Sequence, residues 1–271
     1  MPPPLALVTG ARRGIGASIA MGQVVARRAG AVLTLELSKP GKSNALDQAM
    51  LAALDEQVGL VAEDESIRVV VLRGTEGGAF CSGADIREWA AMSPEDFARQ
   101  WIGDGNEVFR RFERLRCPSV AVIEGLCFGG GLELALCCDL RLASTDARLR
   151  FPEVSIGAIP GWEGGNRFER IAGRGRALEA VLLSRELDPA TALQWGILNA
   201  VCAPDELPAQ LATWTTRLAQ VSPRAASLAK SLIIDPGDHA VAYPAAALAV
   251  RSSADGEAGV RAFFAKTTPI F

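Results

Sequence analysis

The chain has 271 residues, enough for one large domain or two modest ones with a substantial core. Hydrophobic residues make up 49% and charged residues 22% of the sequence, as in globular proteins, and the formal net charge is −3. No run of Lys or Arg is longer than a pair, which argues against a nucleic-acid surface. No apolar segment reaches the roughly 18 uncharged residues of a membrane span, and the N-terminus lacks a signal-peptide pattern. We therefore expect a cytoplasmic protein without membrane or nucleic-acid partners.

The cysteine and histidine content limits the available chemistry. The cysteines form no C-x-x-C pair and lie in apolar segments, which predicts buried, reduced thiols at positions 81, 117, 127, 137, 138 and 202. His239 is the only histidine, so a histidine-based triad or a His-rich metal site would depend on that one residue. We expect no metal, and a carboxylate as any general acid or base.

The first forty residues contain a strand, a glycine-containing turn and a plausible helix. The turn, "TGARRGIG" (9–16), with Glu36 twenty residues further on, resembles the cofactor-binding opening of short-chain dehydrogenases. That family also needs a Tyr-x-x-x-Lys pair, whereas the only tyrosine, Tyr243, is followed four positions later by Ala247. We therefore treat residues 1–23 as an extension of unknown role.

Strands and helices are predicted to alternate after this extension. Apolar runs predict β-strands at 31–37, 69–72, 119–123 and 140–143. Apolar residues at helical spacing predict a helix between the first two strands, with Asp47 at its N-terminus, where an acid is favourable. A charge-rich helix is predicted at 94–115. This order indicates an α/β fold with mostly parallel strands.

The character of the sequence changes near residue 205. Helical patterns separated by Pro and Gly signals predict helices at 207–218, 224–234 and 243–264. We therefore place a boundary there and interpret 205–271 as a helical tail that must pack on something.

Three consecutive glycines, 129–131, lead into an apolar helix that carries a single acid, Glu133. A second acid, Glu153, follows twenty residues later in a Pro-Glu segment, and another glycine-containing turn occupies 79–86. Two turns that expose backbone N–H groups, together with two carboxylates, can hold a negatively charged oxygen and move protons beside it.

Several segments together identify a family resemblance. Residues from about 24 to 271 resemble the crotonase, or enoyl-CoA hydratase/isomerase, family. The matching segments occur in the family's order: "LELSKPGKSNAL" (35–46), "GGAFCSGADI" (77–86), "SVAVIEGLCFGGGLELALCCDLRLAS" (119–144), "FPEVSIGAIPG" (151–161), "GILNAVCAPDEL" (196–207) and "GVRAFFAKTTPIF" (259–271).

This resemblance implies a fold and an activity. The fold is an α/β spiral of repeated β-β-α units over residues 24–204, and the helical segment 205–271 builds homotrimers, often paired as hexamers. The implied activity is an enoyl-CoA hydratase that adds water to a 2-enoyl-CoA thioester. CoA is then part of the substrate, and no separate cofactor is expected.

The resemblance also assigns roles to individual residues. The backbone N–H groups of Ala84 and Gly130 are expected to bind the thioester oxygen as an oxyanion hole. Glu133 and Glu153 are expected to share the water and to act as acid and base, in an order that the sequence leaves open.

Other assignments concern the binding of the substrate. Asp85 and Ile86 lie where family members shape the CoA-binding turn, and Lys266 lies where a basic residue is often near the CoA phosphates. Trp162 either lines the acyl pocket or covers the core. Glu163, where the family has glycine, is either a third acid facing the pocket or a surface charge.

Three other functions stay open at this point. An enoyl-CoA isomerase needs only one acid to shuttle a proton. A non-catalytic protein would bind acyl-CoA without turnover. A dehydrogenase-type protein would bind NAD(P) through the first forty residues.

Overall fold

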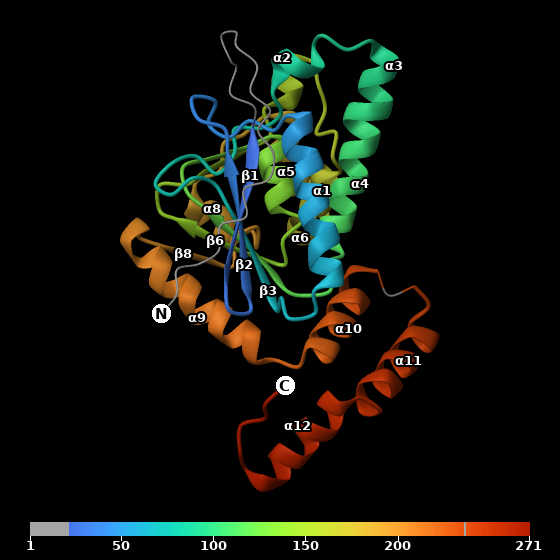
Figure 1. Cartoon of the computed structure of the whole chain (residues 1–271). Coiled ribbons are helices and arrows are strands. Elements are labelled where there is room, and N and C mark those ends of the chain that lie inside the picture. Colours follow the sequence, from blue (N-terminus) through green and yellow to red (C-terminus); the bar gives the residue numbers. More distant parts are fainter. Residues whose placement is uncertain (1–21, 236) are drawn as a thin grey trace, which may run out of the picture.

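The computed structural model describes residues 22–235 and 237–271, and the glycine turn at 9–16 lies outside these residues. A six-stranded sheet with the order β1-β2-β3-β4-β6-β8 forms the centre (Figure 1). Its strands are β1 (Gln23–Ala29), β2 (Val32–Ser38), β3 (Val69–Arg73), β4 (Ser119–Ile123), β6 (Leu140–Ser144) and β8 (Ala200–Cys202). The four predicted strands are therefore confirmed, and all the pairs from β2 to β8 are parallel.

Strand β1 was not predicted. It pairs antiparallel with β2 through a tight turn at Gly30, whose φ of 59° is accessible to glycine at little cost. β1 is an edge strand in which only Val24 is buried, and it contains an Arg pair. Such a strand has no clear apolar alternation, so the periodicity of the sequence could not identify it.

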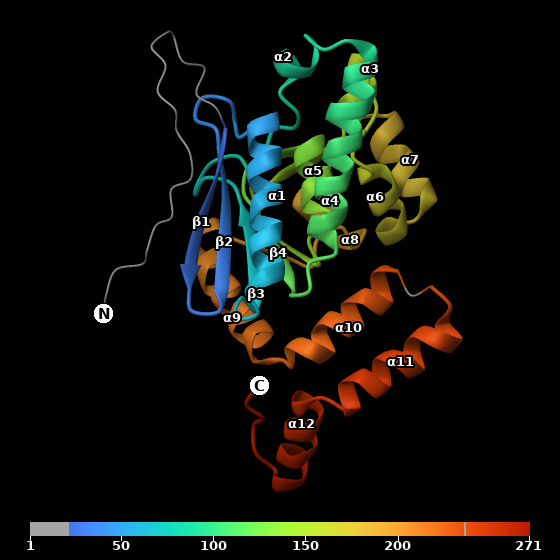
Figure 2. The same ribbon diagram turned by 45° about the vertical axis from the view of Figure 1, so that its right-hand side comes forward.

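Helices cover both faces of the sheet. Helices α1 (Gln48–Glu63) and α4 (Gly105–Glu113) lie on one face, and α9 (Leu207–Gln220) lies on the other (Figure 2). In β3, Val70 and Leu72 belong to the cluster under α1 and α4, whereas Val69 and Val71 belong to the cluster under α9. Burial on both faces explains why the parallel strands are continuous apolar runs.

The predicted helix at 94–115 is one helical run with a change in winding. It begins at the N-cap Ser93 as α3 (Pro94–Asp96), continues as the π-helix η1 (Phe97–Asp104) and ends as α4. The extent of the prediction is confirmed, but the π-helical winding was not predicted. π-Helical turns occur often at functional sites, and η1 contributes to the cavity described below.

A small second sheet completes the repeated unit of the fold. It pairs β5 (Leu126–Phe128) in parallel with β7 (Arg148–Arg150). Twice, a strand of the large sheet is followed by a strand of the small sheet and then by a helical element: β4, β5 and α5 (Gly130–Ala135), then β6, β7 and the 3₁₀-helix η2 (Glu153–Ile156). This confirms the α/β architecture with β-β-α repeats.

The remaining elements are short helices and the C-terminal tail. The short helices are α2 (Ile86–Trp89), α6 (Gly164–Ala172), α7 (Arg174–Leu182), α8 (Pro189–Gln194) and the 3₁₀-helix η3 (Pro204–Glu206). The tail consists of α9, α10 (Pro223–Ile234), α11 (His239–Arg251) and α12 (Ala254–Ala265), and α11 and α12 extend away from the sheet (Figures 1 and 2). None of the helices described is both long and apolar enough to cross a lipid bilayer.

The prediction of one helix over 243–264 is wrong. The chain forms two helices there, because Ser252 ends α11 and the Ser253 side chain accepts a hydrogen bond from the Gly256 N–H as the N-cap of α12. The serine followed by acidic residues is an N-terminal signal. The apolar spacing on either side of it concealed the break.

The prediction of buried, free cysteines is confirmed for five of the six residues. All six cysteines are free, and all but the half-buried Cys202 are buried. Burial raises the pKa of the Cys81 thiol to about 12, so this residue is a small core side chain rather than a nucleophile.

Candidate active site

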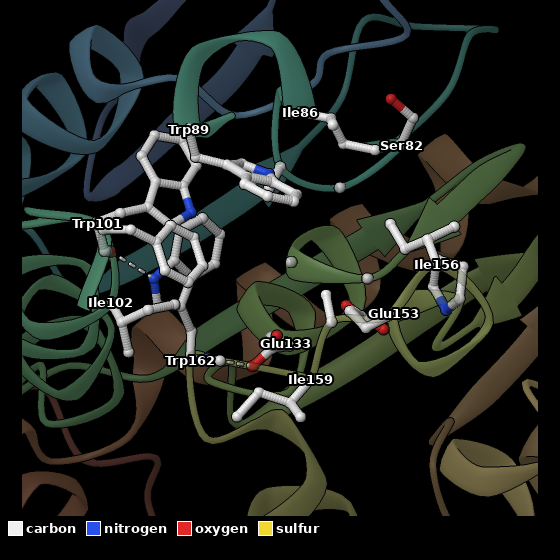
Figure 3. A pocket seen from close by; sticks show the side chains of 18 residues that line it. Ser82, Ile86, Trp89, Trp101, Ile102, Glu133, Glu153, Ile156, Ile159 and Trp162 are labelled. Carbon is white, nitrogen blue, oxygen red and sulfur yellow. Dashed lines mark hydrogen bonds between the residues drawn. The ribbon is translucent and has the colours of Figure 1, made fainter. Parts of the chain in front are cut away.

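A cavity of about 90 Å³ lies where the turn before α2, the start of α5 and the 3₁₀-helix η2 meet (Figure 3). It brings together six of the predicted site residues, which are Ala84, Ile86, Gly130, Glu133, Glu153 and Trp162. The apolar part of its wall comes largely from aromatic and isoleucine side chains, several of them on η1.

The turn at Ala84 is held by its two neighbours. The Leu46 N–H donates to the Gly83 carbonyl over 2.7 Å, and the Asp85 N–H donates to the Leu46 carbonyl, also over 2.7 Å. The Ala84 N–H between them donates to no group in the described part of the chain. This backbone group is therefore available to a ligand in the cavity.

The second glycine turn lies directly beside the first. A Cβ built on Gly83 would lie 3.7 Å from the Gly130 nitrogen, and one built on Gly130 would lie 3.6 Å from the Ala84 nitrogen. Gly130 is the first residue of α5, so its N–H has no partner within the helix. Two backbone amides from distant parts of the sequence therefore lie close together at the cavity.

Glu133 lies in the first turn of α5 and is 1% exposed. Its Oε2 accepts a hydrogen bond from the backbone N–H of Trp162 over 2.7 Å (Figure 3). The same oxygen accepts a second hydrogen bond from the backbone N–H of Gly164 over 2.8 Å. Burial raises the pKa of Glu133 to about 8, and the charge of Glu153 adds to this, against the effect of the two N–H groups and Arg167. Only glycine fits at 164, because a Cβ there would lie 2.3 Å from the Glu133 Cγ.

Glu153 begins η2 and lines the same cavity. Its Oε2 is buried and has no hydrogen-bond partner among the described residues. Burial raises the pKa of Glu153 to about 7. Gly129, with a φ of 49°, lets this acid approach, since a Cβ there would lie 2.7 Å from the Glu153 Oε1. An unpartnered buried oxygen that faces a cavity is a position where water or a substrate can bind.

Trp162 both covers the core and lines the cavity, so the two sequence-based alternatives hold together. It is 2% exposed, and its ring centroid lies 5.4 Å from that of Trp101 and 5.0 Å from that of Phe109. The indole Nε1–H donates to the Trp101 carbonyl over 2.9 Å (Figure 3). The side chain is therefore fixed in one position.

Asp85 lies outside the cavity lining, in a buried ion cluster behind the Ala84 turn. Its carboxylate accepts a hydrogen bond from the Lys39 Nζ over 2.8 Å, and Lys39 also contacts Asp47 over 2.7 Å. The hydrogen bond from Lys39 lowers the pKa of Asp85. Lys39 was not predicted as a site residue, although it follows an apolar strand in the segment Ser-Lys-Pro.

Glu163 is not a third acid of the cavity. Its side chain is 29% exposed and forms an ion pair with Arg110, in which the Arg110 Nε donates over 3.2 Å. Arg110 lowers the pKa of this carboxyl. Of the two alternatives for Glu163, the structure agrees with a charge outside the pocket. Its φ of 63° explains why glycine is the usual residue there.

Lys266 does not line the cavity within the single chain. It is an exposed residue with a φ of 54° that ends α12 in the tail. His239 is likewise exposed, at the start of α11, away from the cavity-lining residues.

This combination of fold and cavity defines an α/β protein with one buried and one half-buried acid beside two backbone amides that have no partner among the described residues. The family model for enoyl-CoA hydratase/isomerase matches residues 27–265. The chain therefore belongs to the enoyl-CoA hydratase/isomerase family, as the resemblance implied.

Individual relatives agree with this membership. The chain is 33% identical over 213 residues to a protein of Clostridium acetobutylicum named "Short-chain-enoyl-CoA hydratase", covering 79% of this chain and 81% of the relative. It is 32% identical over 202 residues to a "Probable enoyl-CoA hydratase 2, mitochondrial" of Arabidopsis thaliana, covering 74% and 67% of the two chains.

A solved structure supports the fold independently. The crystal structure of an enoyl-CoA hydratase from Bacillus anthracis matches with a TM-score of 0.86 and 30% identity, covering 92% of this chain and 98% of that one. The crotonase-type architecture is therefore confirmed.

Proposed function

We propose that the chain catalyses the addition of water across the α,β double bond of a 2-enoyl-CoA thioester. The observation that supports this most directly is the pair formed by the buried Glu133 and the half-buried Glu153. Both line one cavity beside the amides of residues 84 and 130, which donate to no group among the described residues. The names of the relatives from C. acetobutylicum and A. thaliana agree with this reaction.

The two amides act on the thioester oxygen. When the oxygen of water bonds to Cβ, the electrons of the double bond move toward the thioester carbonyl, whose oxygen becomes enolate-like. The N–H groups of Ala84 and Gly130 donate hydrogen bonds to this oxygen, and the N-terminal end of α5 contributes a positive potential. Loss of one such donor in a comparable site costs about 2.7–4 kcal/mol of barrier.

The two carboxyl groups move the protons. One accepts a proton from the attacking water, whose oxygen bonds to Cβ, and the other delivers a proton to Cα, so that the product gains one whole water. The reaction therefore needs one ionised and one protonated acid. Because burial raises the pKa of Glu133 to about 8 and that of Glu153 to about 7, the pair holds about one proton between these values.

The activity test follows the loss of enoyl-thioester absorbance with crotonyl-CoA. We expect turnover by the wild type, and a loss of about 10²–10⁴-fold in kcat for each of the variants Glu133→Gln and Glu153→Gln. Glu186→Gln is the matched control, because this acid pairs with Arg148 outside the cavity. The absence of turnover with every chain length would refute the proposal.

The same variants separate hydration from isomerisation. An isomerase needs a single acid to carry a proton between two carbons, so one of the two glutamine variants would retain nearly full activity on a 3-enoyl-CoA. A protein that only binds acyl-CoA would give heat on titration with a CoA thioester, without any product.

The tail is assigned a role in assembly. We propose that residues 205–271 join copies of the chain into trimers or hexamers. Since Lys266 lies away from the cavity of its own chain, its predicted contact with the CoA phosphates would be made to substrate bound by a neighbouring copy.

A further inference from the structure

The end of the cavity next to Gly130 is closed by the Trp162 indole. A Cβ built on Gly130 would lie 2.5 Å from the Trp162 Cζ3, so the edge of the ring lies directly against the residue whose amide faces the cavity. The indole is therefore a direct neighbour of the position that the thioester takes in the proposed reaction.

Two further glycines lie against the Trp162 and Ile102 side chains at this end of the cavity. A Cβ on Gly105, where η1 passes into α4, would lie 2.3 Å from the Trp162 Nε1. A Cβ on Gly161 would lie 2.5 Å from the Cδ1 of Ile102, the isoleucine that lines the cavity beside the indole. The indole therefore leaves no room for a side chain at Gly105 or Gly130, and Ile102 leaves none at Gly161.

The indole is also held in place from several directions. Its Nε1–H donates to the Trp101 carbonyl over 2.9 Å, and the Trp162 carbonyl accepts a hydrogen bond from the Arg167 Nη1 over 2.6 Å. Its own backbone N–H binds Glu133. A rotation that cleared the indole from the cavity would break its bond to Trp101, leaving a buried donor unpaired.

The indole takes up the space next to the Gly130 amide. The cavity beside it has a volume of about 90 Å³, so an acyl chain that runs from the thioester carbonyl toward the indole meets the ring after a short distance. Two other residues of the cavity lining, Ile156 and Ile159, are 53% and 74% exposed.

We propose that Trp162 limits the length of the acyl group, which makes short 2-enoyl thioesters, such as the four-carbon crotonyl thioester, the preferred substrate class and Trp162 the residue that determines this preference. This inference rests on the proposed function. It goes beyond that function by assigning the chain-length limit to one side chain.

The test compares kcat/KM for 2-enoyl-CoA thioesters of four, eight and sixteen carbons. We expect the wild-type value to fall at least about tenfold from four to eight carbons, since each methylene that does not fit can cost about tenfold or more. The variant Trp162→Ala should raise the ratio of the eight-carbon to the four-carbon value at least about tenfold. A wild-type preference for eight or sixteen carbons, or an unchanged ratio in the folded variant, would overturn the inference.

Controls separate this inference from a general loss of structure. Trp214→Ala removes a partly buried tryptophan of α9, on the other face of the sheet, and should leave the chain-length ratio unchanged. If thermal melting shows that Trp162→Ala is unfolded, Trp162→Phe keeps a ring in the core and should shift the ratio in the same direction by a smaller factor.

Titration calorimetry with saturated acyl-CoA thioesters of the same lengths tests the chain-length limit through binding alone, because these thioesters have no double bond to hydrate. We expect tighter binding of the four-carbon than of the eight-carbon thioester by the wild type, and the reverse order for Trp162→Ala. This order in a protein without hydratase activity would refute the proposed reaction but support the limit. Hydratase activity without this order would refute only the limit.

Discussion

The two carboxyl groups of the cavity differ in their surroundings, since Glu133 is buried and Glu153 is half-buried. Glu133 accepts two backbone hydrogen bonds through one oxygen, whereas Glu153 has a buried oxygen without a partner among the described residues. Backbone N–H donors favour the ionised form of an acid, and burial favours the neutral form. Burial dominates at both residues, because both pKa values are raised, to about 8 and about 7.

This protonation predicts a bell-shaped dependence of kcat/KM on pH. The rate should rise as the first proton leaves the pair near pH 7 and fall as the second leaves near pH 8, because the reaction needs one acid in each form. Initial rates with crotonyl-CoA between pH 5.5 and 9.5 measure the profile. A flat profile over this range would contradict the assignment of the two groups.

The same pKa values predict how stability depends on pH. The pKa of Glu133 rises from 4.5 in the unfolded chain to about 8 in the folded one, so the folded state binds more protons in this range. Its contribution to the free energy of unfolding is fully present below pH 4.5 and is lost as the pH rises through 8. Each unit by which the pKa differs between the folded and the unfolded chain contributes at most about 1.4 kcal/mol to the free energy of unfolding.

Urea unfolding at pH 6 and pH 8.5 measures this effect. The free energy of unfolding of the wild type should fall by on the order of 1–3 kcal/mol from pH 6 to pH 8.5. That of Glu133→Gln should fall clearly less, because the amide has no proton to release. Glu186→Gln, outside the cavity, should behave like the wild type. An equal loss in all three proteins would show that Glu133 does not titrate in this window.

The sequence predicted the positions of both acids but not their properties. Glu133 and Glu153 were identified because they follow glycine-rich and proline-containing segments, which local patterns reveal. Their raised pKa values depend on burial by segments distant in sequence, such as the loop at Trp162 and Gly164. The pairing of Glu163 with Arg110 across 53 positions has no local signal either.

At the scale of elements, a buried ion cluster joins three of them behind the Ala84 turn. Lys39 follows the end of β2, Asp47 is the N-cap of α1 and Asp85 is the N-cap of α2. The Lys39 side chain is only 3% exposed and contacts both acids. Since Ala84 precedes Asp85 directly, this cluster fixes one side of the turn that carries the free amide.

We therefore expect Lys39→Met to destabilise the protein by about 3–5 kcal/mol, because it leaves two largely buried carboxylates without their cation. The folded fraction should also lose kcat more than it changes KM, since the Ala84 amide acts mainly in the transition state. Lys39→Arg keeps the positive charge, so this variant should retain most of the stability and most of the kcat of the wild type.

Urea unfolding and steady-state kinetics measure these effects, and Lys42→Met, a nearby lysine without an ion pair among the described residues, is the control. A variant Lys39→Met with wild-type stability would show that the cluster contributes nothing.

Some helices and strands could be predicted from the apolar pattern of the sequence, and others could not. The central strands and α1 were predicted because burial on one or two faces produces a clear apolar pattern. The edge strand β1 and the break between α11 and α12 were missed, because edge pairing and capping leave that pattern unchanged. The π-helical winding of η1 was missed for the same reason: its residues still have helical spacing.

At the scale of the whole molecule, the tail carries apolar side chains that its own chain does not cover. Phe263 and Phe264 of α12 are 78% and 79% exposed, Leu248 of α11 is 69% exposed, and Ile270 near the C-terminus is 90% exposed. Helices α11 and α12 also stand away from the sheet (Figure 2). Exposed apolar surface of this kind is typical of protein–protein interfaces. The predicted trimer or hexamer would bury it.

Mass measurement by light scattering after size exclusion tests this assembly. We expect three or six times the mass of one chain for the wild type. The double variant Phe263→Asp, Phe264→Asp should lower the mass toward that of one chain, because each buried aspartate would cost several kcal/mol at an apolar interface. Leu60→Asp, on the exposed side of α1, should keep the wild-type mass. If the wild type has the mass of one chain, or if the double variant assembles normally, then α12 does not join the copies, and the position of Lys266 near a neighbouring CoA loses its basis.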